Sequence, residues 1–200
     1  SVPAANPLRA RLMTVSALAT RKPGSPLIVD TLAEHTTNLL VGASNTGKSF
    51  VGLDWACCVA TGTPWNGREV AQGRVLYIAA ESEETIVPRV RAWEQTHGVR
   101  VGDQLIILAA APQFGQPDEV AQLLDICRDG WRFIVIDTLS KVTAGIDEND
   151  NSAMRDALNV ADRARVAANG TALVIHHAGK DASKGARGAS ALKANVATEY

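Results

Sequence analysis

Five short apolar runs are spaced along the chain, and each is continuous rather than alternating with polar residues. A strand that is buried on both faces has this pattern, because neither row of its side chains meets water. The runs therefore predict the strands of a mostly parallel sheet. They are NLLV (38–41), VLYIA (75–79), LIIL (105–108), FIVI (133–136) and ALVI (172–175). The final residues, ATEY, read as the opening of one more strand.

Between these runs, apolar residues recur at helical spacing. Two sets fall at i, i+3, i+4 and i+7: Val120, Leu123, Leu124 and Cys127, and Met154, Ala157, Leu158 and Ala161. Each set forms one apolar stripe that can pack on a sheet. Residues 85–97 predict a weaker helix, in which Pro88 is compatible only with the first turn. Alternating strands and helices indicate a doubly wound α/β domain, with sites at the carboxyl ends of its strands.

The start of the chain differs from the remainder. Residues 1–26 are rich in proline and small residues, which predicts a linker or N-terminal arm. Residues 27–200 are long enough for one domain with a substantial core. Because the chain begins at a serine and stops within a strand pattern, we interpret it as a domain trimmed from a longer protein, with the truncation at its C-terminus.

Composition narrows the function classes. The net charge of −1 argues against a protein that coats nucleic acid through bulk charge, although a local basic patch is compatible with it. Cys57 and Cys58 are adjacent and Cys127 is isolated, a spacing that suggests neither a metal site nor a disulfide framework. This usage fits a reducing compartment and predicts a cytoplasmic location. No signal peptide or membrane-spanning run is visible, so no membrane partner is expected.

The first predicted strand runs directly into GASNTGKS, residues 42–49, which matches the P-loop pattern G-x-x-x-x-G-K-[ST] in full. Its glycines let the backbone curl, so that successive N–H groups point at phosphate oxygens. Lys48 places a cation on the β- and γ-phosphates, the Ser49 hydroxyl can ligate Mg²⁺, and the following helix directs its positive end at the same anions. The strand before and the helix after argue against a chance match. The predicted nucleotide-binding residues are Gly42, Ala43, Ser44, Asn45, Thr46, Gly47, Lys48, Ser49 and Phe50.

A second candidate site residue, Asp137, follows the apolar run FIVI in the segment FIVIDT. An ionised carboxylate at the end of a buried strand is costly without a nearby cation. Asp137 is therefore interpreted as the Walker B carboxylate, which supports Mg²⁺ together with Ser49.

Hydrolysis also requires a group that positions and polarises the attacking water. Thr138 directly follows Asp137, so we look elsewhere for this group. Glu81, at the end of VLYIAAE, is the favoured candidate, delivered by a strand that the sequence predicts to neighbour the P-loop strand. Glu83 and Glu84 are competitors, but they are expected at the exposed start of the next helix, where acidic residues suit the helix dipole.

Four segments, GASNTGKS, YIAAESE, FIVIDTLS and VIHHAGKDASKGARGASAL, together resemble the RecA-like ATPases of the plasmid RepA and DnaB-type replicative helicase group. The resemblance covers roughly residues 26–200. It implies a RecA-like P-loop NTPase fold, ATP as the nucleotide, and Glu81 as the catalytic base. It also implies a hexameric ring of identical subunits, with ATP at each subunit boundary and single-stranded DNA in the centre.

Two adjacent histidines, His176 and His177, end the last apolar run. Adjacent strand residues point to opposite faces, so the pair cannot share one metal ion or phosphate. His35 and His97 lie in unrelated segments, and a metal site is not expected. The resemblance implies that His177 is a sensor of the γ-phosphate. Hydrogen bonding within the core is the alternative for either histidine, and it is the preferred interpretation for His176.

The glycine-rich loop after the histidines carries Lys180, Lys184 and Arg187. The resemblance implies that this is a DNA-binding loop facing the ring centre; a solvated surface loop is the alternative. The preceding loop, KVTAGIDENDNS, is acidic, would repel phosphates and is not assigned to DNA.

RecA-like helicases complete each active site with a cationic side chain, the finger, from the neighbouring subunit. This chain departs from them at that position. Ala197 or Thr198 stands where RepA-like proteins can carry it, and Arg187 is only a weak substitute. Without a finger, phosphoryl transfer would lose a factor on the order of 10³. The isolated domain is therefore expected to hydrolyse ATP slowly.

The predicted function is Mg²⁺-dependent ATP hydrolysis, with Lys48, Glu81 and His177 as catalytic residues, in a DNA helicase or translocase of plasmid or phage replication or recombination. Two alternatives stay open. One is an ATP-switched recombination mediator or assembly protein that does not unwind DNA, and the other is a KaiC-like signalling ATPase without nucleic acid. Of the remaining side chains, Trp55 is expected in the core and Arg89 on a solvent-exposed face.

Overall fold

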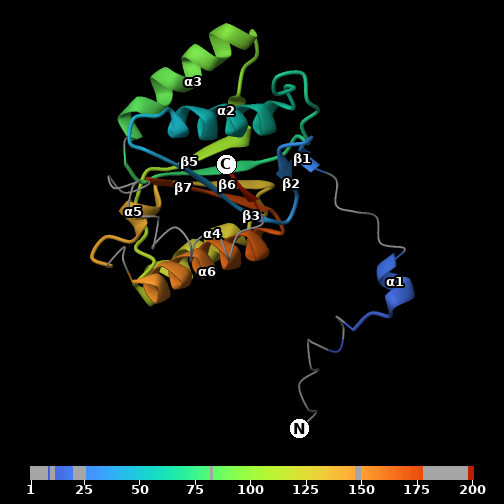
Figure 1. Ribbon diagram of the computed structural model, residues 1–200. Coiled ribbons are helices and arrows are strands. Elements are labelled where there is room, and N and C mark those ends of the chain that lie inside the picture. Colours follow the sequence, from blue (N-terminus) through green and yellow to red (C-terminus); the bar gives the residue numbers. More distant parts are fainter. Residues whose placement is uncertain (1–8, 10–11, 20–25, 82, 147–149, 178–197) are drawn as a thin grey trace.

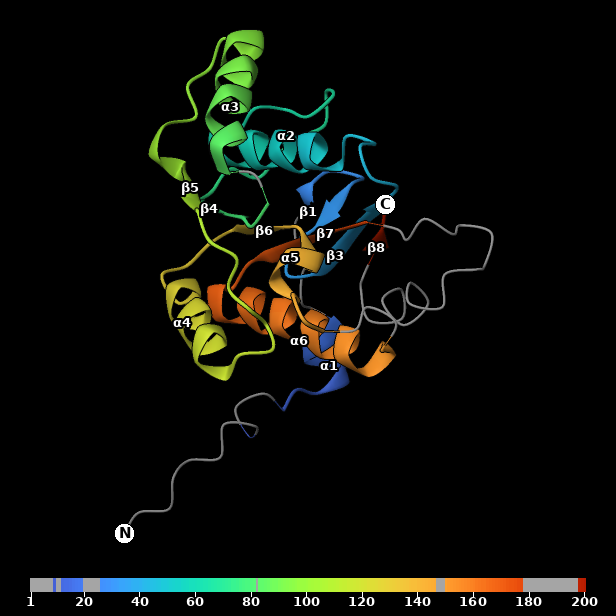
Figure 2. The same cartoon turned by 90° about the vertical axis from the view of Figure 1, so that its left-hand side faces the viewer.

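Figure 1 shows a central sheet between two layers of helices. The computed structural model describes Arg9 and residues 12–19, 26–81, 83–146, 150–177 and 198–200. Its strands are β1 (Pro26–Ile28), β2 (Leu32–Ala33), β3 (Thr37–Gly42), β4 (Val75–Ala79), β5 (Leu105–Leu108), β6 (Phe133–Asp137), β7 (Thr171–His177) and β8 (Thr198–Glu199). Its α-helices are α1 (Val15–Ala19), α2 (Lys48–Thr61), α3 (Glu83–His97), α4 (Pro117–Cys127), α5 (Leu139–Val142) and α6 (Asn151–Ala168). Helices α2 and α3 cover one face of the sheet, and α4 and α6 cover the other (Figures 1 and 2).

Six strands form the central sheet in the order β5-β4-β6-β7-β3-β8, and every neighbouring pair is parallel. All five predicted strands are confirmed, as is the fold class of a mostly parallel sheet flanked by helices. The ATEY segment supplies the short β8, which pairs with β3. Because the strands are parallel, the carboxyl ends of β3, β4, β6 and β7 meet at one edge, with β7 between β3 and β6.

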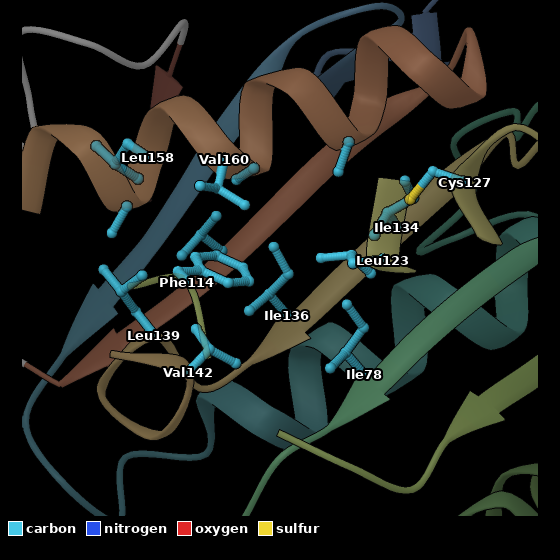
Figure 3. Close-up of a cluster of buried hydrophobic side chains, with 14 of the residues drawn as sticks. Ile78, Phe114, Leu123, Cys127, Ile134, Ile136, Leu139, Val142, Leu158 and Val160 are labelled. Carbon is cyan, nitrogen blue, oxygen red and sulfur yellow. The ribbon is translucent and has the colours of Figure 1, made fainter. Parts of the chain in front are cut away.

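The face beneath α4 and α6 buries an apolar cluster, part of which Figure 3 shows. Both predicted helical stripes are confirmed, since all eight of their residues are buried. They pack against even-numbered residues of the sheet, such as Ile134 and Ile136, and against Phe114. The helical period of 3.6 and the strand period of 2 thus meet in one core.

The opposite face, beneath α2 and α3, takes odd-numbered residues of the same strands: Val75, Tyr77, Ala79, Phe133, Val135, Leu173 and Ile175. Because successive side chains alternate between the faces, this row continues with Asp137 and His177 at the strand ends. His176 falls in the other row and is buried. Asp137 and His177 therefore lie on the face that carries α2, and His176 does not.

One helix corrects an expectation. The sequence predicts Pro88 in the first turn of a helix over 85–97, but α3 begins at Glu83 and Pro88 lies in its second turn. The prediction is wrong because Glu83 and Glu84 extend the helix at its N-terminus, where acidic side chains suit the dipole. Pro88 is exposed, so water can satisfy the carbonyl that its missing N–H leaves free.

The predicted N-terminal arm includes α1, which lies apart from the sheet in Figure 1. The boundary predicted after residue 26 falls within β1. The division of the chain into an arm over 1–26 and a domain over 27–200 stays a prediction.

Candidate active site

A cavity of about 340 Å³ lies at the carboxyl edge of the sheet. Its lining comes from the P-loop, the start of α2, α3, and the ends of β4, β6 and β7. The lining residues are Asn45, Thr46, Gly47, Lys48, Ser49, Phe50, Ala79, Glu81, Ile86, Arg89, Asp137 and His177. Every residue predicted as catalytic or as a metal ligand is among them. Of the other predicted nucleotide-binding residues, Gly42 ends β3, and Ala43 and Ser44 lead from it to this lining.

The P-loop turns through residues with left-handed backbone. Asn45 has a φ of 64° and Gly47 a φ of 86°, which glycine adopts without steric cost. Gly42 is needed for a different reason, because a Cβ there would lie 3.1 Å from Thr46 Oγ1. That hydroxyl donates to the carbonyl of Ala43 at 2.8 Å. One motif glycine therefore serves backbone conformation and the other serves close approach.

Lys48 is the first residue of α2 and is buried. Its Nζ donates to the carbonyl oxygens of Gly42, at 2.8 Å, and Ala43, at 2.7 Å. Burial lowers the pKa of Lys48, whereas the carboxylates of Asp137 and Glu81 act in the opposite direction. The main-chain acceptors and the two carboxylates thus stabilise a cation at the point where the P-loop meets α2.

Asp137 joins three elements at the end of β6. Ser49 Oγ donates to its Oδ1 at 2.9 Å, and the Tyr77 hydroxyl donates to its Oδ2 at 2.6 Å. Asp137 is buried, and the peptide bond that joins it to Thr138 is cis. Burial raises the pKa of Tyr77 well above its usual value, and Asp137 adds to that shift. Tyr77 therefore stays a hydroxyl donor, and both oxygens of the buried carboxylate are satisfied.

Ser49 and Asp137 suit a magnesium ion by their chemistry. They offer a hydroxyl and a carboxylate, both hard oxygen donors. Mg²⁺ commonly takes one or two protein ligands and fills its other positions with phosphate oxygens and water. Across the described ranges, no group of three or more His, Cys, Asp or Glu side chains is arranged to hold a metal. The pair thus fits a metal that arrives with a nucleotide.

Glu81 and His177 face each other across the cavity lining. His177 Nε2 lies 3.6 Å from Glu81 Oε2. The Nδ1 atom of His177 is buried and has no hydrogen-bond partner among the described residues. Glu83 and Glu84 lie in the first turn of α3, as the sequence indicates, and both are exposed. Of the three glutamates, only Glu81 lines the cavity.

The path that brings Glu81 to the site differs from the prediction. The sequence predicts that β4 neighbours β3; that prediction is wrong, because β6 and β7 lie between them. Ala79 at the end of β4 pairs with Asp137, and Glu81 lies two residues further on. Three strand spacings of about 4.8 Å each separate β4 from β3. Glu81 reaches toward His177 at the end of β7, which is two spacings from β4.

Arg89 and Ile86 also line the cavity, although no motif in the sequence indicates this. The sequence predicts Arg89 on a solvent-exposed face; that prediction is wrong, because Arg89 is half-buried and lines the cavity. Its guanidinium carbon lies 4.5 Å from the centre of the exposed Phe50 ring. The helical phase of α3 was the available signal, since Ile86, Arg89 and Trp93 are spaced at three and four residues. The cavity thus gains a second cation and a flat apolar surface.

The tryptophans near the site are structural. Trp55 is buried, as expected, and packs edge-on against Trp65 with 5.5 Å between the ring centres. Asp54 on α2 accepts the indole N–H of both Trp65 and Trp93, each at 2.8 Å. The Trp93 bond ties α3 to α2, and the Trp65 bond ties the segment after α2 to the same carboxylate, a role for Asp54 that no sequence motif indicates.

Lys180, Lys184 and Arg187, the predicted DNA contacts, lie outside the described residues. So do Ala197 and part of the acidic loop, namely residues 147–149. Their roles stay predictions.

A family model described as an AAA domain matches residues 4–183. The match supports an AAA-type ATPase of the P-loop class and nucleotide binding, and it gives no specific support for a RepA- or DnaB-type protein. A search of curated proteins found no match to the chain. In the part of the chain that the structure describes, no helix has the length and apolar character needed to cross a membrane.

Proposed function

Because the chain belongs to the AAA domain family, whose members are P-loop ATPases, we propose that it hydrolyses ATP with Mg²⁺ and that this reaction drives a DNA helicase or translocase. One observation carries the proposal of hydrolysis. Lys48, Asp137 and Glu81, from three different segments, line the same cavity beside the P-loop. A cation for phosphate, a carboxylate for the metal and a candidate base are the parts that the reaction requires.

The P-loop and Lys48 bind the triphosphate in this proposal. Backbone N–H groups and the N-terminus of α2 surround the phosphates, and the Lys48 ammonium turns from the carbonyls of Gly42 and Ala43 to the β- and γ-oxygens. Ser49 and Asp137 hold Mg²⁺, which supplies positive charge to neutralise the phosphates during transfer.

Glu81 positions the attacking water and accepts its proton. His177, at 3.6 Å from Glu81, donates to the γ-phosphate, as the resemblance to RecA-like ATPases implies. The position of β7 between β3 and β6 supports this role, because the end of β7 is then flanked by the P-loop on one side and Asp137 on the other.

Glu81→Gln tests the role of the base. The substitution keeps the shape of the side chain and removes the proton acceptor, so turnover should fall by about 10²–10⁴-fold while ATP still binds. Glu84→Gln, in the exposed first turn of α3, is the matched control and should keep parental turnover. Full turnover in the Glu81 variant and a large loss in the control would move the base to α3.

The proposal that the protein acts on DNA is independent of the proposal that it hydrolyses ATP. It has its support in the basic residues Lys180, Lys184 and Arg187 and in the resemblance to ring helicases. Assembled rings should hydrolyse ATP faster when single-stranded DNA is added, and DNA binding should weaken as salt rises. Because the domain alone is expected to hydrolyse ATP slowly, the assay compares the rates with and without DNA at the same protein concentration.

Replacing the three basic residues by alanine should lower the slope of DNA affinity against salt concentration, because fewer phosphate contacts release fewer counterions. Arg128→Ala, at the end of α4, removes an exposed cation elsewhere and should leave that slope unchanged. No stimulation by DNA would favour a signalling ATPase. Stimulation without strand displacement would favour a recombination mediator.

A further inference from the structure

Tyr77 lies in the middle of β4 and is fully buried, yet its hydroxyl ends on the carboxylate of Asp137. The strand register pairs Tyr77 with Val135 and Ala79 with Asp137. The tyrosine side chain therefore leans along the sheet by two residues, about 6–7 Å, toward the carboxyl edge. A phenylalanine would fill the same space in the core and would leave the carboxylate without this donor.

The two oxygens of Asp137 have different partners. Oδ1 accepts from Ser49, the residue suited to bind magnesium with it, and Oδ2 accepts from Tyr77. The short bond to Tyr77 fixes the rotation of the carboxylate, because the tyrosine ring is held in the packed core beneath α2. Oδ1 is then kept turned toward Ser49.

We propose that Tyr77 is a positioning residue that sets the affinity of the Ser49–Asp137 pair for the magnesium ion of the nucleotide. This inference rests on the proposed magnesium-dependent function and deepens it. Tyr77 touches neither metal nor nucleotide and acts through Asp137.

The neutrality of the donor matters for this role. A lysine or arginine at Oδ2 would also satisfy the carboxylate, but its positive charge would oppose the approach of a second cation. A phenol O–H stabilises the buried anion and leaves its charge available to the metal. Lys48, the nearby cation, directs its hydrogen bonds to the carbonyls of Gly42 and Ala43.

Binding of a fluorescent ATP analogue as a function of Mg²⁺ concentration tests the proposal without relying on turnover. Tyr77→Phe should raise the Mg²⁺ concentration for half-maximal tight binding about 10-fold, which corresponds to the loss of one hydrogen bond to a charged group. Binding in EDTA should be unchanged. Thr171→Val is the matched control: it removes a buried hydroxyl at the amino edge of the sheet, where Thr171 Oγ1 bonds the backbone of His35 and Ala33.

The outcomes separate the two claims. If the parent chain binds the analogue no better with Mg²⁺ than in EDTA, the proposed function fails. If the parent shows that dependence and Tyr77→Phe has the same Mg²⁺ requirement as the parent, only the positioning role fails, and Tyr77 contributes to the core alone. A rise in the Mg²⁺ requirement for Tyr77→Phe but not for Thr171→Val supports the role.

A second measurement applies if Tyr77→Phe does not fold. The chain has two tyrosines, so fluorotyrosine labelling gives two fluorine signals in NMR spectra, which Tyr200→Phe assigns. The Tyr77 signal should shift when nucleotide and Mg²⁺ are added together and should stay in place with nucleotide in EDTA. An unmoved signal in saturating Mg²⁺ and nucleotide would overturn the inference.

Discussion

The two faces of the central sheet bury different kinds of side chain. Beneath α4 and α6, apolar residues of two amphipathic helices pack on Leu39 of β3 and on even-numbered residues of β4, β6 and β7. Beneath α2 and α3 the core is equally closed, but it continues into Tyr77, Asp137 and Lys48 as it nears the carboxyl edge. These three groups are buried and hydrogen-bonded or paired with main-chain acceptors.

The face beneath α4 and α6 mainly stabilises the fold, whereas the edge of the face beneath α2 and α3 also carries the groups suited to chemistry. Apolar burial contributes free energy of folding wherever it occurs, whereas a buried polar group contributes only when every donor and acceptor is matched. Loss of volume beneath α4 and α6 should therefore lower stability, whereas loss of a polar side chain at the edge beneath α2 and α3 should lower nucleotide binding or turnover. Three predictions test this division, beginning with the largest expected effect.

Lys48→Ala should lower affinity for MgATP, or turnover, by about 10²–10³-fold, because it removes the cation placed on the phosphates. The free energy of unfolding without nucleotide should change by less than about 1 kcal/mol, since burial already disfavours the charged lysine. Nucleotide titration and denaturant unfolding measure the two quantities. Lys141→Ala, an exposed lysine of α5, should alter neither. If Lys48→Ala lowered the free energy of unfolding by as much as it weakened the binding of MgATP, the two faces would not differ in the way proposed.

Leu123→Ala should lower the free energy of unfolding by about 2–5 kcal/mol, because the side chain is fully buried in the cluster beneath α4. Molecules that remain folded should bind MgATP with parental affinity. Val166→Ala, at a position 58% exposed on α6, serves as the control and should change stability by less than about 0.5 kcal/mol. Weakened nucleotide binding in folded Leu123→Ala would show that the two faces are coupled.

The buried thiols on the two faces should make the free energy of unfolding depend on pH under alkaline conditions. Burial raises the pKa of Cys58, on the α2 face, and of Cys127, on the α4 face, each to about 12 from the usual 9.0. The folded protein keeps these protons while the unfolded chain loses them above pH 9, so stability is full below pH 9 and falls as pH rises toward 12. Each thiol should contribute about 1.4 kcal/mol per pH unit.

Cys127→Ala should remove its share of that slope and leave the remainder. Denaturant unfolding at several pH values between 9 and 11 measures the slope. A slope that is the same in Cys127→Ala and in the parent would mean that the Cys127 thiol ionises as easily in the fold as in the unfolded chain.

Sequence patterns predicted the fold well, because the parallel strands are buried on both faces and read as continuous apolar runs. The P-loop was equally readable, since its glycines and Lys48 stand at fixed spacing along one segment. Strand order was not readable. Nothing local in the chain distinguishes β4 beside β3 from the observed arrangement with β6 and β7 between them.

Contacts between side chains that are distant in the sequence could not be predicted from it either. Tyr77 looks like any aromatic residue of a buried strand, and only its partner 60 residues away reveals its polar role. Arg89 was assigned to solvent because a charged residue on a helix usually faces water. Its place at the cavity depends on how α3 packs against α2, a contact that includes the hydrogen bond from Trp93 of α3 to Asp54 of α2.

A crystal structure with a non-hydrolysable ATP analogue and Mg²⁺ tests the central claim most directly. We expect the triphosphate within the loop of residues 42–49, the metal beside Ser49 and Asp137, and the carboxylate of Glu81 facing the γ-phosphate. An analogue bound elsewhere, or a triphosphate in the loop with Glu81 and Asp137 turned away from it, would contradict the account.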